Sequence, residues 1–109
     1  MTKDDWVYID HIQASLSKID NYIDGMTEQE FLADEKTSDA VIRQFEIIGE
    51  ATKNISSTFR NNHNTIPWKD MAGMRDVLIH DYMGVDIWMV WKTAIEDAPI
   101  LLEELLKLK

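Results

Sequence analysis

Residues 75–82, RDVLIHDY, place a guanidinium, an imidazole and a phenol around a short apolar run. Histidine is the side chain best suited to proton transfer near neutral pH. Arginine offers a planar fork for phosphate oxygens and stays charged. Arg75 and His80 therefore suit metal-free cleavage of RNA. His80 would move the proton of the ribose 2′-hydroxyl or of the leaving oxygen, and Arg75 would stabilise charge on the phosphate.

Helical spacing relates these side chains to one another. Successive residues of an α-helix turn by about 100°, so Arg75 and Tyr82, seven apart, share one face. Asp76 and His80, four apart, share another face and can hydrogen-bond, which would orient the imidazole. Arg75 and His80 diverge by roughly 140°. They can still converge on one ligand at a helix end, and Gly84 places such an end close by.

A purely structural interpretation of the same residues stays open. An aspartate four before a histidine often forms a structural pair, and an Arg–Tyr pair seven apart often packs on a surface. His11 and His63 have no histidine three or four residues away, and the chain has no cysteine. The sequence therefore predicts neither a metal site nor a cofactor.

RNA cleavage normally uses both an acid and a base, whereas this motif supplies one histidine. A two-fold dimer would bring two copies of His80 and Arg75 together. Residues 88–108 also hold more apolar side chains than one helix face needs. That surplus fits a subunit interface, and it equally fits a small bundle that needs every anchor.

The positions of the apolar residues predict helices throughout. The first stripe steps by three and four along Trp6, Ile9, Ile12, Leu16, Ile19 and Ile23, and the second along Val41, Phe45, Ile48, Thr52, Ile55 and Phe59. No segment alternates with the period of a strand. We therefore expect an all-α fold, an antiparallel bundle of four or five helices, in a single domain over residues 1–109.

Local signals set the expected boundaries. Gly25 ends the first helix, TEQE (27–30) opens a short one to about Ala33, and DEKTS (34–38) interrupts the pattern. Residues 61–67 read as a loop. A helix beginning at Trp68 would carry the motif as far as Gly84. Asp86 would cap the last helix, and Pro99 would kink it or start its final piece.

The charge is unevenly distributed. The formal net charge is −9, which argues against a general coat for nucleic acid. Residues 41–80 are the exception, with five Lys/Arg against four Asp/Glu, so a small anionic ligand site is conceivable only there. Apolar runs are short, and residues 1–10 do not look like a signal peptide. We expect no membrane span and a cytoplasmic protein.

Three stretches together resemble a known family. RDVLIHDY matches the R-x4-H-x-Y form of the HEPN superfamily (higher eukaryotes and prokaryotes nucleotide-binding domains), specifically its HepT-like toxins. IPWKDMAGMRDVLIHDYMGVD (66–86) resembles the family's signature helix, and FEIIGEATKNIS (45–56) resembles its I-G-E-A helix. The Trp-rich last helix with a proline also fits, so the resemblance covers essentially the whole chain.

The resemblance implies a function. It implies a homodimer, or a higher oligomer, in which two motifs line a shared cleft. It implies a metal-independent endoribonuclease that is the toxin of a type VII-like toxin–antitoxin pair. Carried over, Arg75 and His80 are catalytic, and Asp76 and Glu50 support them. Tyr82 would receive AMP from a minimal nucleotidyltransferase antitoxin, and the bulky anion would repel RNA.

Two other interpretations compete with this one. The chain could be a non-catalytic, nucleotide- or substrate-binding subunit of a small nucleotidyltransferase, in which Arg75 contacts phosphate without bond cleavage. It could also be a purely structural helical dimer, in which case Arg75→Ala and His80→Ala would behave as wild type.

Overall fold

The residues that the structure describes form helices and no strand. It is a computed structural model, and it describes residues 4–74 and 86–108. The helices are α1 (Asp5–Ile23), α2 (Glu28–Ala33), α3 (Glu35–Lys53), α4 (Ser57–Asn62), α5 (Trp68–Ala72), α7 (Ile87–Lys92), the π-helical turn η1 (Thr93–Asp97) and α8 (Ala98–Leu106). The all-α prediction is confirmed.

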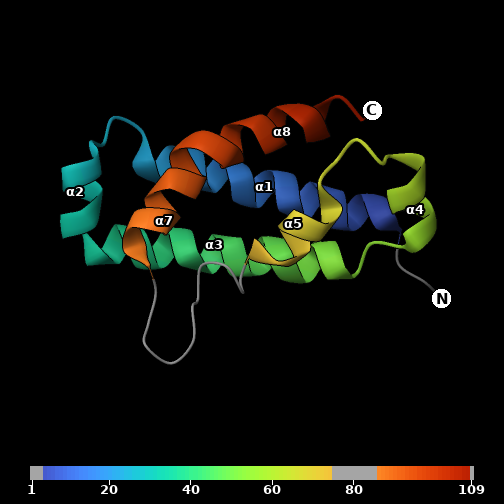
Figure 1. Ribbon diagram of the computed structural model, residues 1–109, viewed down its shortest axis with the longest axis horizontal. Helices are drawn as coiled ribbons and strands as arrows, with labels where there is room; N and C mark the ends of the chain where they lie inside the picture. Colours follow the sequence, from blue (N-terminus) through green and yellow to red (C-terminus); the bar gives the residue numbers. More distant parts are fainter. Residues whose placement is uncertain (1–3, 75–85, 109) are drawn as a thin grey trace.

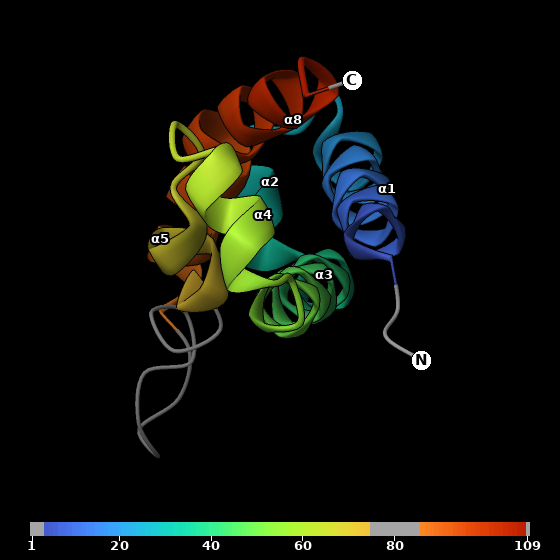
Figure 2. The ribbon, with the colours of Figure 1, turned by 90° about the vertical axis from the view of Figure 1, so that its right-hand side faces the viewer.

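Two long helices make the frame of the bundle. α1 and α3 lie side by side and run in opposite directions, and the chain from α7 through η1 to α8 returns across them (Figure 1). Viewed from the end, α1, α3 and α8 surround a common centre, with α4 and α5 closing the side next to α3 (Figure 2). The arrangement is the expected antiparallel bundle.

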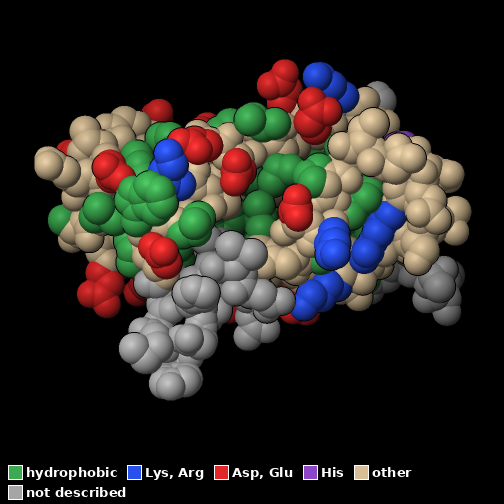
Figure 3. Space-filling model, in the orientation of Figure 1, with side chains coloured by type: hydrophobic (Ala, Val, Ile, Leu, Met, Phe, Trp, Pro, Cys, Tyr) green, Lys and Arg blue, Asp and Glu red, His purple; other side chains and the backbone are tan. Residues whose placement is uncertain are grey.

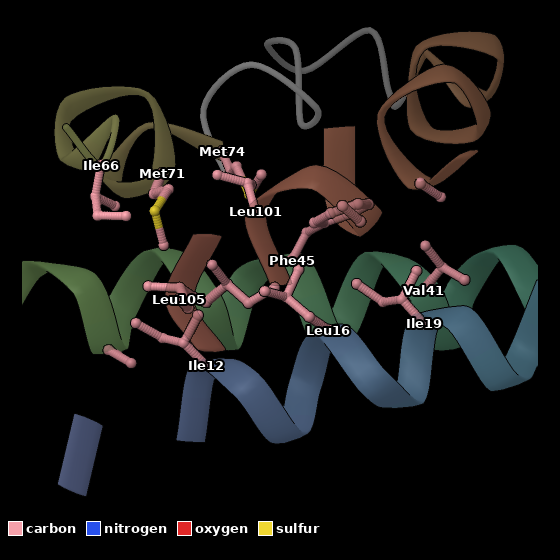
Figure 4. Packing of buried hydrophobic residues seen from close by; sticks show 14 of the residues in the cluster. Ile12, Leu16, Ile19, Val41, Phe45, Ile66, Met71, Met74, Leu101 and Leu105 are labelled. Atoms are coloured by element: carbon pink, nitrogen blue, oxygen red, sulfur yellow. The ribbon is translucent and has the colours of Figure 1, made fainter. Parts of the chain in front are cut away.

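The core is one continuous cluster of apolar side chains. Ile12, Leu16 and Ile19 of α1 point toward Phe45 of α3, and Leu105 of α8 enters the same space (Figure 4). All five side chains are at most 1% exposed. Burying an aliphatic or aromatic side chain of this size contributes roughly 1.5–3 kcal/mol, so contacts among α1, α3 and α8 stabilise the fold.

The predicted end of the first helix and the predicted bounds of the second are correct, and the start of α1 is set by Asp4. The Asp4 carboxylate accepts the Trp6 N–H at 3.0 Å and caps α1. Gly25 follows α1 with φ +76°, a conformation that glycine adopts without steric cost. Thr27 and Glu30 then form a reciprocal capping box, with hydrogen bonds of 2.8 and 3.2 Å that open α2.

The break expected at DEKTS is present, but it is confined to Asp34, and the rest of the stretch is helical. α3 begins at Glu35, one residue after α2's C-cap Asp34. The Asp34 carboxylate accepts the backbone N–H of Thr37 at 3.0 Å and its hydroxyl at 2.7 Å. One aspartate therefore ends α2 and caps α3, so a polar stretch without apolar periodicity is the first turn of a long helix.

The second predicted helix is two helices. α3 ends at Lys53, and the Ser56 side chain caps α4 by accepting the Phe59 N–H at 3.1 Å. Ile55 and Phe59 are nevertheless buried, as the apolar spacing predicted. Apolar periodicity alone does not reveal the turn that the serine introduces. Because α4 reaches Asn62, the following loop starts two residues later than expected.

The last helix follows its prediction closely. Asp86 caps α7 by accepting the Met89 N–H at 3.1 Å, and Pro99 lies in the first turn of α8, where a missing N–H costs little. The large apolar side chains that it exposes are Trp88, Ile95, Ile100 and Leu106. The apolar surplus is thus only partly absorbed by the core. Within the described ranges, no helix is both long and apolar enough to cross a bilayer.

Candidate functional site

The motif itself falls in residues 75–85, outside the described residues. Arg75, Asp76, His80 and Tyr82, and the expected helix as far as Gly84, are therefore not placed. Their roles stay predictions. What the structure does define is the helical frame on both sides of the segment.

The frame before the motif is firmly anchored. The Trp68 side chain is 6% exposed, and its indole N–H donates to the His63 carbonyl at 2.9 Å. Its ring meets Phe59 with 6.0 Å between centroids. Met71 is fully buried, and Met74, the residue before Arg75, is 7% exposed and points toward Leu101 of α8 (Figure 4). The predicted helix start at Trp68 is confirmed. The helix that starts there, α5, ends at Ala72, before the motif.

The described helices resume directly after the motif segment. Asp86, directly after the undescribed segment, is the N-cap of α7, and Val90 and Trp91 are buried one turn later. The Trp91 ring lies 5.2 Å from that of Phe31, which ties α7 to α2. The chain therefore enters the segment from the buried Met74 and leaves it at the exposed N-cap Asp86, one turn before buried residues of α7.

Glu50 is the one predicted site residue that the structure describes. Its side chain is 61% exposed on α3, and its carboxylate lies 3.9 Å from the Lys53 ammonium. An exposed pair of this kind contributes little to stability. The residue is thus open to solvent, and its supporting role stays a prediction.

The other two histidines lie beside aromatic rings, with His63 partly buried and His11 exposed. The His63 ring lies 4.5 Å from Phe59 and 6.3 Å from Trp6, and the His11 ring lies 6.5 Å from Tyr8. Across the described chain, no group of three or more His, Asp or Glu side chains is placed to hold a metal ion.

Two cations that precede the motif, Arg60 and Lys69, were not singled out by the sequence pattern. Lys and Arg side chains gather over α5 and the neighbouring ends of α3 and α4 (Figure 3). Arg60 and Lys69 line a shallow hollow there. The only signal in the sequence was that residues 41–80 are the one stretch that is not acidic.

An all-helical bundle that frames an R-x4-H-x-Y segment between two packed helices defines the class of HEPN-like domains. The family model described as ribonuclease HepT-like matches residues 12–108. This chain belongs to that family.

Curated relatives agree with the family. "Probable ribonuclease HepT" of Thermococcus cleftensis is 46% identical over 102 residues, which are 94% of this chain and 93% of the relative. "Gamma-glutamylcyclotransferase and putative RNase" of Methanocaldococcus jannaschii is 46% identical over 108 residues, or 99% of this chain. The chain spans 49% of the length of that second relative. No solved structure matches.

Proposed function

We propose that the protein is a metal-independent endoribonuclease and the toxin of a type VII-like toxin–antitoxin pair. The observation that carries the proposal is that the HepT-like family match covers residues 12–108 and so includes the complete R-x4-H-x-Y motif. The relatives named as ribonucleases, 46% identical over nearly the whole chain, support the same activity.

The proposed reaction is an internal transesterification. The ribose 2′-oxygen attacks the adjacent phosphorus, a new P–O bond forms, and the bond to the 5′-oxygen breaks. One histidine takes the 2′-hydroxyl proton, and another gives a proton to the leaving 5′-oxygen. The guanidinium of Arg75 neutralises charge on the non-bridging oxygens in the transition state. The products are a 2′,3′-cyclic phosphate and a 5′-hydroxyl, so the reaction needs no co-reactant.

Two histidines imply a homodimer. His80 of each chain would supply one acid or base, and the paired Arg75 side chains would concentrate positive charge in an otherwise acidic protein. Trp88 of α7 and Ile95 of the following turn η1 are both exposed, which supports an apolar subunit contact. Sedimentation should give the mass of a dimer. A species that stays monomeric at the concentrations used for cleavage would contradict this arrangement.

The proposed partner is a minimal nucleotidyltransferase. The Tyr82 oxygen would attack the α-phosphorus of ATP, losing its proton and releasing pyrophosphate. The attached AMP places a bulky anion two residues from His80, where it repels an RNA phosphate. We assign Asp76 and Glu50 supporting roles: Asp76 can orient the imidazole, and Glu50 adds polarity from α3.

The decisive experiment is RNA cleavage by the purified, unmodified protein in EDTA. Wild type should cut RNA, and His80→Ala should lose the activity. The matched control is His11→Ala, because His11 is an exposed histidine on α1. Complete loss of cleavage on chelation would exclude the metal-free mechanism. A dimer that binds nucleotides yet leaves every RNA intact would instead favour the non-catalytic nucleotidyltransferase subunit.

A further inference from the structure

A shallow hollow lies where α4, the loop after it and α5 meet. Its volume is about 480 Å³, within the range of small-ligand sites. The lining residues are Arg60, Asn61, Asn64, Ile66, Pro67, Trp68, Lys69, Asp70 and Ala72. Two cations and two side-chain amides thus share one open surface, which is the chemistry that RNA phosphates and 2′-hydroxyls accept.

Unlike Lys53, Lys92 and Lys107, the two cations of this hollow are not paired with a carboxylate of the described residues. The Lys92 ammonium pairs with Glu96, and the Lys107 ammonium lies 3.3 Å from Glu104. Among the described residues, neither Arg60 nor Lys69 has a carboxylate within 4 Å. This protein is acidic as a whole. A surface that holds two such cations together is therefore a place where a polyanion can bind.

The fold holds the arginine in place. The Arg60 Nη2 donates to the Thr52 carbonyl in the last turn of α3 at 2.8 Å. Its Nε is buried with no hydrogen-bond partner in the described chain. The side chain is therefore fixed between α3 and α4, which reduces the entropy lost when it binds a ligand.

The lysine lies on a rigid support as well. Lys69 is exposed, between the buried Trp68 and the Asp70 side chain in the first turn of α5. Trp68 anchors that turn through its hydrogen bond to the His63 carbonyl. Asp70 is exposed at the other side of Lys69 and lowers the local positive charge. The hollow thus suits single phosphates of a strand rather than a broad duplex surface.

We propose that this hollow binds the phosphate backbone of single-stranded RNA and guides the strand to the motif, an inference that rests on the proposed ribonuclease function. Lys69 and Arg60 contact phosphates, and Asn61 and Asn64 hydrogen-bond sugar or base edges. The hollow's lining reaches Ala72, three residues before Arg75 in the sequence. Lys69 and Arg60 are binding residues and take no part in the bond cleavage.

The test measures RNA binding without cleavage. Full-length protein carrying His80→Ala is titrated against a fluorescein-labelled single-stranded RNA, and anisotropy is followed over a series of salt concentrations. Adding Lys69→Ala should weaken binding about fivefold and lower the slope of log K against log salt by about 0.7. Lys69→Glu should weaken binding further. Lys18→Ala, the same charge change at an exposed position on α1, should match the parent.

The outcomes separate this inference from the proposed function. If wild type cleaves RNA but both Lys69 variants bind RNA like the parent, the hollow is not the docking site and the nuclease proposal stands. If wild type does not cleave RNA but the Lys69 effect is present, the docking site is supported and the nuclease proposal fails. A parent protein that binds no RNA overturns both. In the active protein, Lys69→Ala should raise KM more than it lowers kcat.

Discussion

Asp5 and Ser56, 51 residues apart, join the start of α1 to the start of α4 by two hydrogen bonds. The Asp5 carboxylate accepts the Ser56 backbone N–H at 2.8 Å and its hydroxyl at 2.7 Å. The same hydroxyl oxygen caps α4 by accepting the Phe59 N–H. This junction fixes α4, and with it Arg60, against the long helices.

Ser56→Ala should therefore destabilise the protein. The substitution removes the cap of α4 and leaves the Asp5 carboxylate with one hydrogen bond fewer. We expect a loss of about 1 to 2 kcal/mol in the free energy of unfolding, measured with denaturant. Ser57→Ala, at the next and also exposed position, is the control. Equal stability of the two variants would mean that the junction contributes nothing.

Two adjacent leucines of α8 should respond very differently to truncation. Leu105 is fully buried against α1 and α3, whereas Leu106 is 61% exposed. Leu105→Ala should cost about 2 to 5 kcal/mol because it leaves a cavity in the core. Leu106→Ala should stay within about 0.5 kcal/mol in the monomer. A large loss for Leu106→Ala that depends on protein concentration would place that residue in a subunit contact.

The sequence predicted the helical core well, because apolar spacing reports burial directly. Every member of the α1 stripe from Ile9 to Ile23 is buried. Apolar spacing did not locate the start of α3 or the break before α4, because both depend on capping hydrogen bonds. Asp34 and Ser56 are polar residues without apolar periodicity, and only the folded geometry shows which backbone N–H each accepts.

The cap at Asp34 predicts a pH dependence. The Thr37 backbone N–H, and then its hydroxyl, donate to the Asp34 carboxylate and lower its pKa below the ordinary aspartate value. A lowered folded-state pKa means that the carboxylate's stabilisation is complete above the unfolded-state pKa and is lost as pH falls through the folded-state value.

Asp34→Asn keeps an acceptor but removes the charge. The difference in unfolding free energy between wild type and this variant should therefore be constant near neutral pH. It should shrink as pH falls below about 4. Asp39→Asn, an equal charge change at an exposed position on α3, is the reference. A difference that grows on acidification would contradict the assigned cause.

The candidate site was less predictable from sequence than the core. Types and spacing singled out Arg75, His80 and Tyr82, because each carries distinctive chemistry. Arg60 and Lys69 are ordinary surface cations by type. Their shared hollow depends on how α4 and α5 pack against each other. No local pattern in the sequence predicts that packing. Glu50 was selected by resemblance alone, and its exposed position leaves its contribution to be measured.

Tyr82→Phe tests the proposed regulation. The phenylalanine ring keeps the bulk and apolar character of the tyrosine but has no oxygen to accept AMP. The variant should therefore go on cutting RNA when the partner nucleotidyltransferase and ATP are present, whereas wild type should stop. Mass spectrometry should find one AMP on wild type and none on the variant. Tyr22→Phe, a change at an exposed tyrosine of α1, should be modified and silenced like wild type. Silencing of Tyr82→Phe by the partner would show that inhibition works through contact and not through the attached nucleotide.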